Sequence, residues 1–364
     1  MLVVRSPVRI SFAGGGTDLP SFYERFEGAV LSTAINKYFY TVLQKREDDK
    51  VQIISSDLRV VETWRDISHA TYAGTDLAIP LAVLKELKCD VPIDMFLASE
   101  TPPGTGLGSS ASVCVNVLKT MTTYLGLPYS KHDLAEHAFH IARNVLGKSV
   151  GKQDEYASAF GGLNLITFRR DGSVHVEPII LDPALLRELQ NNLMLFFTGA
   201  AHHSWTILQE QEKSTQTEKG VAIESLHAIR AMTERARNAL VKGDLNEFGA
   251  LLHEGWECKK KVAHGISSPH IDEVYRLARE NGAIGGKITG AGGGGFLLLY
   301  CTQRHQASVR QALTAWGARE MEFDFDLNGA QVVVNDPFID GDQRGGARWT
   351  FRPVSSESLV GSLG

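Results

Sequence analysis

Residues 3–12 alternate between apolar and polar side chains, with apolar residues at every second position from Val8 onward. A two-residue period is typical of a β-strand that has one polar face. Stretches rich in β-branched, aromatic and aliphatic residues predict further strands. A charged turn at 45–50 interrupts them. In the first half of the chain we expect strands at 28–44 (one long strand or a hairpin), 51–55, 60–64 and 91–98.

Apolar residues that recur every three or four positions predict helices in other parts of the chain. The stretch at 130–146 also begins with a capping box, in which Ser130 is the N-cap and Asp133 lies three residues later. Its histidines are interpreted as helix-surface residues, because no carboxylate–histidine metal motif accompanies them. The predicted helices lie at 20–26, 77–87, 130–146, 222–241, 245–261, 271–281 and 304–315, and strands are expected at 193–197, 296–300, 320–325 and 330–334.

The pattern changes near Arg169–Gly172, where charged and turn residues interrupt it and long helices follow. We therefore place a domain boundary there, with one domain at 1–170 and a second at 171–335. After Asn335 apolar residues are few, so 336–364 is expected to be a tail without a core of its own.

The composition limits the classes of function. The chain has 364 residues, of which 43% are hydrophobic and 22% charged, and its net charge is −5. This balance is ordinary for a globular protein and argues against a nucleic-acid partner. No apolar run is long enough to span a bilayer, and no signal peptide is recognisable. The four cysteines are far apart without a C-x-x-C pair, so we expect no zinc site, no disulfide framework and a cytoplasmic location.

A glycine-rich stretch, TPPGTGLGSSAS at 101–112, lies between the strand expected at 91–98 and an apolar run with helical spacing. This order is the context of an anion-binding loop, because the first N–H groups of a helix are unpaired and the helix dipole is positive there. Glycine also lets the backbone approach an anion closely. The stretch is not a P-loop, since no lysine precedes Ser109, and it lacks the dinucleotide-binding glycine spacing. A tight turn with a helix N-cap is the alternative.

Two further glycine clusters mark places where a ligand could meet the backbone. The first, Gly14–Gly16, is followed by Asp18, whose alternative role is to cap the next helix. The second is Gly285–Gly295, in which seven of eleven residues are glycine. Arg9, on the polar face of the first strand, is either a site residue or a surface charge. We interpret Lys259–Lys261 as a solvated helix end that favours the C-terminal dipole.

Three separated motifs resemble those of the GHMP kinases, the family of galactokinase, homoserine kinase, mevalonate kinase and phosphomevalonate kinase. The resemblance covers roughly 1–335 in the expected order, and its second motif is the most specific. It implies an α+β fold, in which an N-terminal domain like ribosomal protein S5 domain 2 and a ferredoxin-like C-terminal domain hold ATP between them. The motifs are Pro7-x-Arg9-Ile10-x-Phe12-x-Gly14-Gly15-Gly16-x-Asp18, Pro103-Gly104-x-Gly106-Leu107-Gly108-Ser109-Ser110-Ala111 and Lys287-x-Thr289-Gly290-Ala291-Gly292-Gly293-Gly294.

Within this family, AGGGTDLPSFY at 13–23 and the segment Gln153–Gly162 look most like the D-glycero-D-manno-heptose 7-phosphate kinases. The resemblance implies transfer of the γ-phosphoryl group of ATP, with Mg²⁺, to the anomeric hydroxyl of that sugar phosphate. The 1,7-bisphosphate product would supply nucleotide-activated heptose for surface polysaccharide. The partners are then ATP and a sugar phosphate, with neither nucleic acid nor membrane, and a homo-oligomer is possible.

Positions in the motifs imply the role of each residue. Asp154 would accept the hydroxyl proton or orient the hydroxyl, Arg9 would stabilise charge on the transferring group, and Ser110 would contact Mg²⁺. The ATP phosphates would be wrapped by Pro103, Gly104, Thr105, Gly106, Leu107, Gly108, Ser109 and Ser110. The substrate would contact Gly14, Gly15, Gly16, Thr17, Asp18, Gln153, Gly290, Ala291, Gly292 and Gly293, with Asp18 on the sugar hydroxyls.

One position departs from the family pattern, because many relatives carry a Mg²⁺-binding glutamate where this chain has Ala142. Mg²⁺ would then depend on Ser110, Asp154, phosphates and water. Two other functions stay open: another GHMP kinase, acting on a different sugar or an isoprenoid alcohol, and a non-catalytic ligand sensor. The Gly14–Asp18 stretch favours a polyol, and the presence of Arg9, Ser110 and Asp154 argues against a sensor. The cationic candidates for binding the phosphate that the sugar already carries are Lys152, Arg143 and His202.

Overall fold

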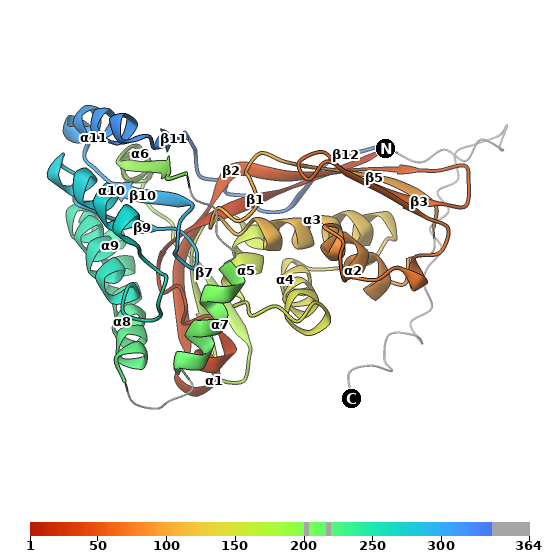
Figure 1. The fold of residues 1–364 in the computed structure, drawn as a ribbon, viewed down its shortest axis with the longest axis horizontal. Coiled ribbons are helices and arrows are strands. Elements are labelled where there is room, and N and C mark those ends of the chain that lie inside the picture. The colour runs from red at the N-terminus through yellow and green to blue at the C-terminus, as the bar shows by residue number, and fades with distance from the viewer. Residues whose placement is uncertain (90, 200–203, 216–219, 337–364) are drawn as a thin grey trace.

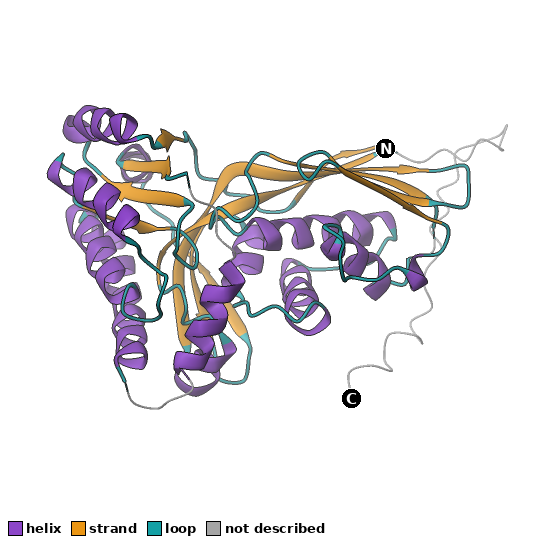
Figure 2. Ribbon diagram, viewed as in Figure 1, coloured by secondary structure: helices purple, strands orange, loops and turns teal. Residues whose placement is uncertain are grey.

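The computed structural model describes residues 1–89, 91–199, 204–215 and 220–336. These residues form a larger and a smaller β-sheet, each packed against helices (Figures 1 and 2). No helix among them is long and apolar enough to cross a membrane. The candidate His202 and the expected tail beyond Asp336 lie outside the described residues.

The larger sheet has eight strands, and its central strand is β2, which pairs with neighbours along its whole length. Residues 39–45 of β2 pair with β5, and residues 28–33 pair with β6, while β1 lies along the other edge. The stretch predicted as a long strand or a hairpin is therefore one continuous strand. The strands are β1 (Leu2–Ala13), β2 (Gly28–Lys45), β3 (Val51–Ser55), β4 (Val60–Trp64), β5 (Ile93–Ser99), β6 (Leu163–Phe168), β7 (Val174–Pro178) and β12 (Gln331–Asn335).

Helices cover one face of this sheet, as Figure 1 shows for α2 to α5. The helix α3 lies against β1 and β2, and its buried Asn116 donates hydrogen bonds from Nδ2 to the carbonyl oxygens of Val4 and Phe39. The capping box predicted at Ser130 is present. The helices are α1 (Pro20–Phe26), α2 (Ala78–Glu86), α3 (Ser109–Tyr124), α4 (Lys131–His140), a π-helical turn (Ile141–Val145), α5 (Gln153–Phe160) and a short 3₁₀ turn (Ile67–His69).

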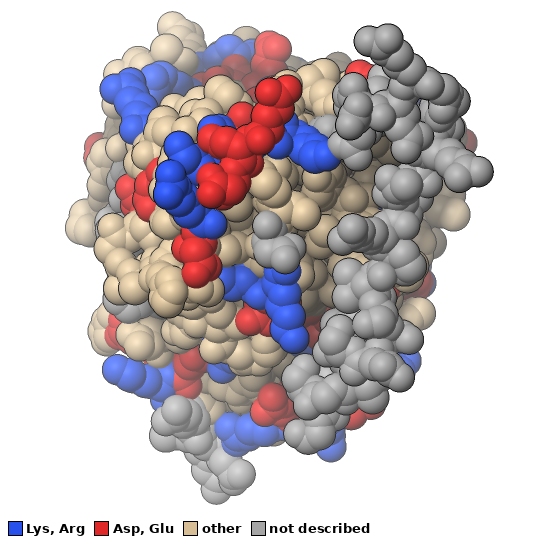
Figure 3. Space-filling model, turned by 90° about the vertical axis from the view of Figure 1, so that its right-hand side faces the viewer, with Lys and Arg blue, Asp and Glu red and all other residues tan. Residues whose placement is uncertain are grey.

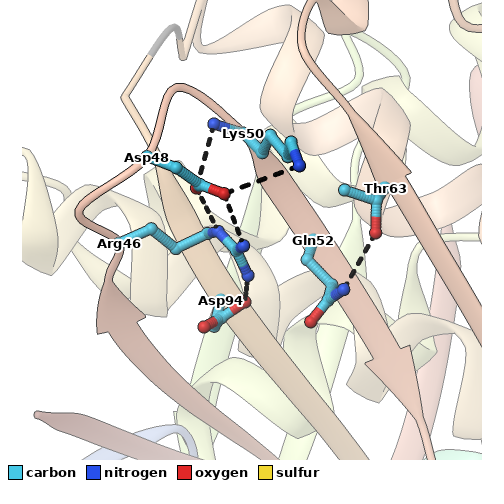
Figure 4. Close-up of polar contacts among 6 residues, drawn as sticks. All are labelled: Arg46, Asp48, Lys50, Gln52, Thr63 and Asp94. Carbon is cyan, nitrogen blue, oxygen red and sulfur yellow. Dashed lines mark hydrogen bonds and ion pairs between the residues drawn. The ribbon is translucent and has the colours of Figure 1, made fainter.

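The charged turn predicted at 45–50 is held together by one arginine (Figure 4). Arg46 donates hydrogen bonds to Asp48 within the turn and to Asp94 on β5. The hydrogen bonds from Arg46 lower the pKa of Asp48 to about 2. This contact ties the tip of the long β2 strand to its neighbour.

The smaller sheet is antiparallel, in the order β11-β8-β10-β9, and has its own helices. Its core is continuous with part of the larger sheet, because Phe12 of β1 packs edge-on against Phe248 of α9 with ring centroids 5.2 Å apart. The elements are α6 (Pro183–Asn191), β8 (Leu193–Phe197), α7 (Ser204–Thr215), α8 (Val221–Lys242), α9 (Leu245–Lys259), α10 (Pro269–Glu280), β9 (Gly285–Ile288), β10 (Phe296–Tyr300), α11 (Gln303–Trp316) and β11 (Arg319–Glu320).

The two sheets divide the chain differently from the boundary placed near residue 170. That boundary falls in the hairpin of β6 and β7, which both belong to the larger sheet. The strand β12, assigned from the sequence to the second domain, pairs with β1 of the larger sheet. The part of the chain that builds the smaller sheet is thus inserted between β7 and β12. On the face in Figure 3, basic and acidic side chains of the described residues are interspersed.

Candidate active site

A cavity of about 360 Å³ lies where the glycine-rich loop, α5 and the second domain meet. Its walls come from segments that are distant in the sequence, including β1, the start of α3, the π-helical turn and α9. The predicted site residues that line it are Arg9, Gly16, Asp18, Pro103, Gly104, Thr105, Gly106, Gly108, Ser109, Ser110, Gln153, Asp154, Gly290 and Ala291.

The glycine-rich loop, residues 103–108, leads directly into α3. Its glycines Gly104, Gly106 and Gly108 have φ of 73°, 81° and 78°, in the left-handed region where other residues are strained. No side chain caps α3, whose N-cap is Gly108. The first N–H groups of α3 are therefore left facing the cavity region without a side-chain acceptor, as an anion site at a helix N-terminus requires.

The loop also packs tightly on the third motif. A Cβ atom at Gly106 would lie 2.5 Å from the carbonyl oxygen of Thr289, and one at Gly295 would lie 2.3 Å from that of Thr105. Gly290 in turn leaves room for the backbone of Gly106. Glycine at these positions therefore lets the backbones of the two domains touch, in addition to any approach of a ligand.

Arg9 and Asp154 form an ion pair at the cavity wall. Nε of Arg9 donates to Oδ1 of Asp154 at 2.9 Å, and Nη2 lies 2.7 Å from the same oxygen. Nη1 of Arg9 donates to the carbonyl oxygen of Gly106 at 2.6 Å. Arg9 is buried, so it is not a surface charge. Its guanidinium thereby holds the loop and the first turn of α5 in a fixed relation.

The carboxylate of Asp154 remains accessible from the cavity, since 27% of its side chain is exposed. Its Oδ2 has no hydrogen-bond partner among the described residues, and a Cβ atom at Gly108 would lie 3.2 Å from it. Desolvation raises the pKa of Asp154, while the Arg9 guanidinium opposes this rise and Asp18 adds to it. Perturbed carboxylates in a cavity are frequent at catalytic sites.

Asp18 joins the first glycine turn to α5. Its Oδ1 accepts hydrogen bonds from the backbone N–H of Gly16 and from Nε2 of Gln153, and its Oδ2 accepts one from the backbone N–H of Gln153. The alternative that Asp18 caps the next helix is wrong, because Leu19 is the N-cap of α1. Asp18 still lines the cavity, so it is placed to reach a bound substrate.

Six predicted site residues do not line the cavity, and their contacts are with other parts of the protein. Gly14 and Thr17 pack on Ala29 of β2, and Leu107 lies in the hydrophobic core. Gly292 and Gly293 pack on Ile266, with a hydrogen bond from the N–H of Gly293 to the carbonyl oxygen of Ile266. The sixth, Gly15, accepts a hydrogen bond from a lysine side chain described below.

Glu155 lines the cavity, although none of the sequence motifs assigns it a role. It is 2% exposed, and its Oε2 has no hydrogen-bond partner in the described part of the chain. Burial and then the charge of Asp154 raise the pKa of Glu155 well above its ordinary value. Ala142, in the π-helical turn, lines the same cavity. The adjacent acids in Gln153-Asp154-Glu155 are a signal that could have drawn attention to it.

Lys259 corrects the interpretation of the three lysines as a solvated helix end. It is buried, and its Nζ donates to the carbonyl oxygen of Gly15 at 3.2 Å and to Oε1 of Gln211 at 2.9 Å. Lys260 and Lys261 are partly or fully exposed. The sequence does contain a signal for the burial of Lys259. At helical spacing, this residue continues the apolar face of α9 that includes Phe248, Leu252 and Trp256.

Lys152 and Arg143, the two described cations suggested for the phosphate of the sugar, do not line the cavity. Nζ of Lys152 is bound by Glu136 and the carbonyl oxygen of Gly172. Arg143 is paired with Glu212 on α7. Both side chains therefore have structural partners outside the cavity lining.

The histidines of α4 pack against neighbouring side chains. His132 lies 3.0 Å from the hydroxyl oxygen of Tyr156, and His137 and His140 both lie near Glu86. Within the described ranges, no group of three or more His, Cys, Asp or Glu side chains is arranged to hold a metal ion.

Comparison with known proteins identifies the family. The models for the GHMP kinases N terminal domain and the GHMP kinases C terminal region match residues 77–162 and 236–319. The D-glycero-alpha-D-manno-heptose 7-phosphate kinase of Campylobacter jejuni is 29% identical over 334 residues, which cover 90% of this chain and 97% of that protein.

Solved structures give the same result. A D-glycero-D-manno-heptose 1-phosphate kinase from Bacteroides thetaiotaomicron is 28% identical and superposes with a TM-score of 0.77, covering 93% of this chain and 100% of the other. The galactokinase of Lactococcus lactis, at 20% identity, shares the fold with a TM-score of 0.72 over 91% of this chain and 94% of its own.

The chain belongs to the GHMP kinases, as its motifs suggest, and it has their α+β fold of two domains. Its relatives, together with the glycine-rich loop and the paired Arg9 and Asp154, define it further as an ATP-dependent sugar kinase.

Gly106→Ala tests the double role of the loop glycines. We expect weaker binding of a non-hydrolysable ATP analogue and a loss of stability of more than about 1 kcal/mol, because backbone strain and a clash with Thr289 add together. Gly74→Ala is the matched control: its φ is 80°, but a Cβ atom there meets nothing within 4 Å. Nucleotide titration and thermal unfolding check both variants. Equal behaviour of the two would show that the contact between the domains carries no energy.

Proposed function

We propose that this sugar kinase transfers the γ-phosphoryl group of ATP to the anomeric hydroxyl of D-glycero-D-manno-heptose 7-phosphate. The observation that carries the proposal is the Arg9–Asp154 pair, which faces a cavity bounded by the glycine-rich loop and by Gly16 and Asp18. The similarity to the heptose 7-phosphate kinase of Campylobacter jejuni supports this acceptor. The 1,7-bisphosphate product would then serve the synthesis of nucleotide-activated heptose for surface polysaccharide.

The ATP phosphates would lie against residues 103–110. The uncapped N-terminus of α3 supplies N–H donors and the positive end of the helix dipole. The glycines remove the Cβ atoms that would keep an anion from the backbone. Arg9, whose guanidinium also reaches Gly106 of this loop, would stabilise the charge on the transferring group.

Asp154 would act on the acceptor. Arg9 occupies its Oδ1, so Oδ2 is the oxygen left to accept a hydrogen bond from the anomeric hydroxyl. As the bond from the anomeric oxygen to the γ-phosphorus forms and the bond to the leaving ADP oxygen breaks, Oδ2 would take the hydroxyl proton. Arg9 also fixes the orientation of the carboxylate, and positioning is most of what phosphoryl transfer asks of a protein.

The cavity contains groups that suit Mg²⁺, the ion with which ATP is usually bound. Hard divalent cations prefer oxygen ligands, and they commonly keep several waters. Ser110 and Glu155 both line the cavity, and Oε2 of Glu155 has no hydrogen-bond partner among the described residues. We propose that these two hold the ion and that Glu155 replaces the glutamate missing at Ala142. Bound Mg²⁺ would neutralise charge on the phosphates.

An acceptor screen tests the proposed function. The chain is incubated with ATP and heptose 7-phosphate, heptose 1-phosphate, the free heptose, galactose or mevalonate, and products are identified by ³¹P NMR. We expect the highest kcat/KM with heptose 7-phosphate and a new anomeric phosphate signal. Preference for heptose 1-phosphate would mean that a hydroxyl other than the anomeric one accepts the phosphoryl group, as the name of the Bacteroides relative would suggest. ATP consumption with none of them would favour the sensor hypothesis.

Asp154→Asn keeps the shape of the side chain but removes the base. We expect kcat to fall by about 10²-fold or more, the usual scale for a lost general base, with little change in the KM for the sugar. Arg9→Lys should lose less than Arg9→Ala, because it keeps a charge but not the planar fork. Single-turnover kinetics provide the measurement, and Asp272→Asn, an exposed carboxylate on α10, is the control. Near-normal turnover in a folded Asp154→Asn protein would refute the role of Asp154 as base.

Glu155→Gln tests the proposed metal ligand without relying on activity. We expect Mn²⁺ to bind more weakly to the complex with a non-hydrolysable ATP analogue, by about tenfold or more for a lost charged ligand, as seen by electron paramagnetic resonance. Adding Ala142→Glu to this variant should restore the affinity, whereas Ala142→Gln should not. Unchanged Mn²⁺ affinity in Glu155→Gln would remove Glu155 from the metal site.

A further inference from the structure

The buried lysine of α9, Lys259, connects the second domain to Gly15 and Gly16, which the sequence motifs assign to the acceptor. Two of the three N–H groups of Lys259 donate to Gly15 and Gln211. Gln211, itself fully buried on α7, also donates from Nε2 to the carbonyl oxygen of Gly16. Lys259 lines the cavity beside Gly16 and Asp18. Its ammonium is therefore oriented by neutral partners and has one N–H left over.

A second lysine, Lys287 of β9, adds to this positive charge. It is 8% exposed, and its Nζ has no hydrogen-bond or ion-pair partner among the described residues. The charges that act on it come from Lys259, Arg9 and Asp18. It is also the first residue of the third glycine motif, so the backbone on which it lies is held against the glycine-rich loop.

The acids nearby do not balance these two ammonium groups. Asp154 is engaged by Arg9, and Asp18 already accepts three hydrogen bonds from Gly16 and Gln153. Burial lowers the pKa of Lys259 to about 8. Burial and, after it, the charge of Lys259 lower the pKa of Lys287 to about 7. Buried charges in proteins are normally paired. Lys259 lines the cavity and lacks a carboxylate partner within the described ranges, and Lys287, which is not a lining residue itself, adds a second unpaired charge that acts on the same region, so the pair favours a bound anion.

We propose that Lys259 and Lys287 form a subsite for the phosphate group that the acceptor sugar already carries. The inference rests on the proposed function and adds to it the residues that select a phosphorylated acceptor. Its position supports the acceptor over the nucleotide, because Lys259 donates a hydrogen bond to Gly15 and lines the cavity with Gly16 and Asp18. A phosphate monoester carries up to two negative charges and three acceptor oxygens, which match two ammonium donors.

The kinetic test compares a phosphorylated with an unphosphorylated acceptor. We expect Lys259→Met and Lys287→Met each to raise the KM for heptose 7-phosphate by about 10- to 100-fold, the range for a lost hydrogen bond to a charged group. The KM for the free heptose and the KM for ATP should change little. Lys261→Met, an exposed neighbour on the same segment, is the control and should behave like the wild type.

The other outcomes contradict the proposal. A rise in the KM for ATP alone would assign the lysines to the nucleotide phosphates. Equal losses with both sugars would give Lys259 a structural role between the domains. Lys259→Arg keeps the charge, so it separates the two cases if Lys259→Met is unstable. It should retain most of the preference for the phosphorylated sugar. If the lysine were purely structural, this preference would not depend on its charge.

A binding measurement separates this inference from the proposed function. The nucleotide loop is first filled with a non-hydrolysable ATP analogue and Mg²⁺, and inorganic phosphate is then titrated into the protein by calorimetry. We expect phosphate to bind the wild type and the Lys261→Met control, and to bind Lys259→Met and Lys287→Met at least about tenfold more weakly. This result would support the subsite even if no heptose were phosphorylated. Equal phosphate affinity in all four proteins would refute it even if the kinase were active on heptose 7-phosphate.

Discussion

The guanidinium of Arg9 is the contact on which the site depends. From one strand of the larger sheet it reaches the carbonyl oxygen of Gly106 in the glycine-rich loop and the carboxylate of Asp154 on α5. Because Arg9 is buried, the geometry of these three segments is set by hydrogen bonds in a region of low dielectric, where charged contacts are strong. The same interaction leaves Oδ2 of Asp154 free and turned toward Gly108. The position of the glycine-rich loop and the orientation of the Asp154 carboxylate thus follow from one side chain.

Backbone contacts between the domains complete the site. Gly106, Gly290 and Gly295 allow the loop and the third motif to approach within distances that a Cβ atom would forbid. The second domain that carries the third motif is inserted between β7 and β12 of the larger sheet. Lys259 and Lys287 belong to that second domain. In our proposal, the second domain thereby binds the phosphate group of the acceptor sugar.

The sequence predicts most of the elements, because each has a clear period. The predicted strands at 51–55 and 60–64 have the same bounds as β3 and β4, and the predicted strand–loop–helix context of the glycine-rich loop is correct. The pair of Arg9 and Asp154 could be proposed only through the family resemblance, since local pattern leaves Arg9 open as a surface charge. The elements that have no predicted counterpart are α5, α6, α7, β6, β7 and β9. Lys259 escaped prediction because it lies in a run of lysines, although it continues a buried face, and Glu155 because the motif resemblance singled out its neighbour Asp154.

The central claim is that the anomeric hydroxyl and the γ-phosphate meet between Asp154, Arg9 and the glycine-rich loop. A crystal structure of the complex with a non-hydrolysable ATP analogue, Mg²⁺ and heptose 7-phosphate tests it most directly. The account predicts the anomeric oxygen within hydrogen-bonding distance of Oδ2 of Asp154, in line with the γ-phosphate at the guanidinium of Arg9. A sugar bound with its anomeric oxygen away from Asp154, or a triphosphate that does not lie against residues 103–110, would contradict it.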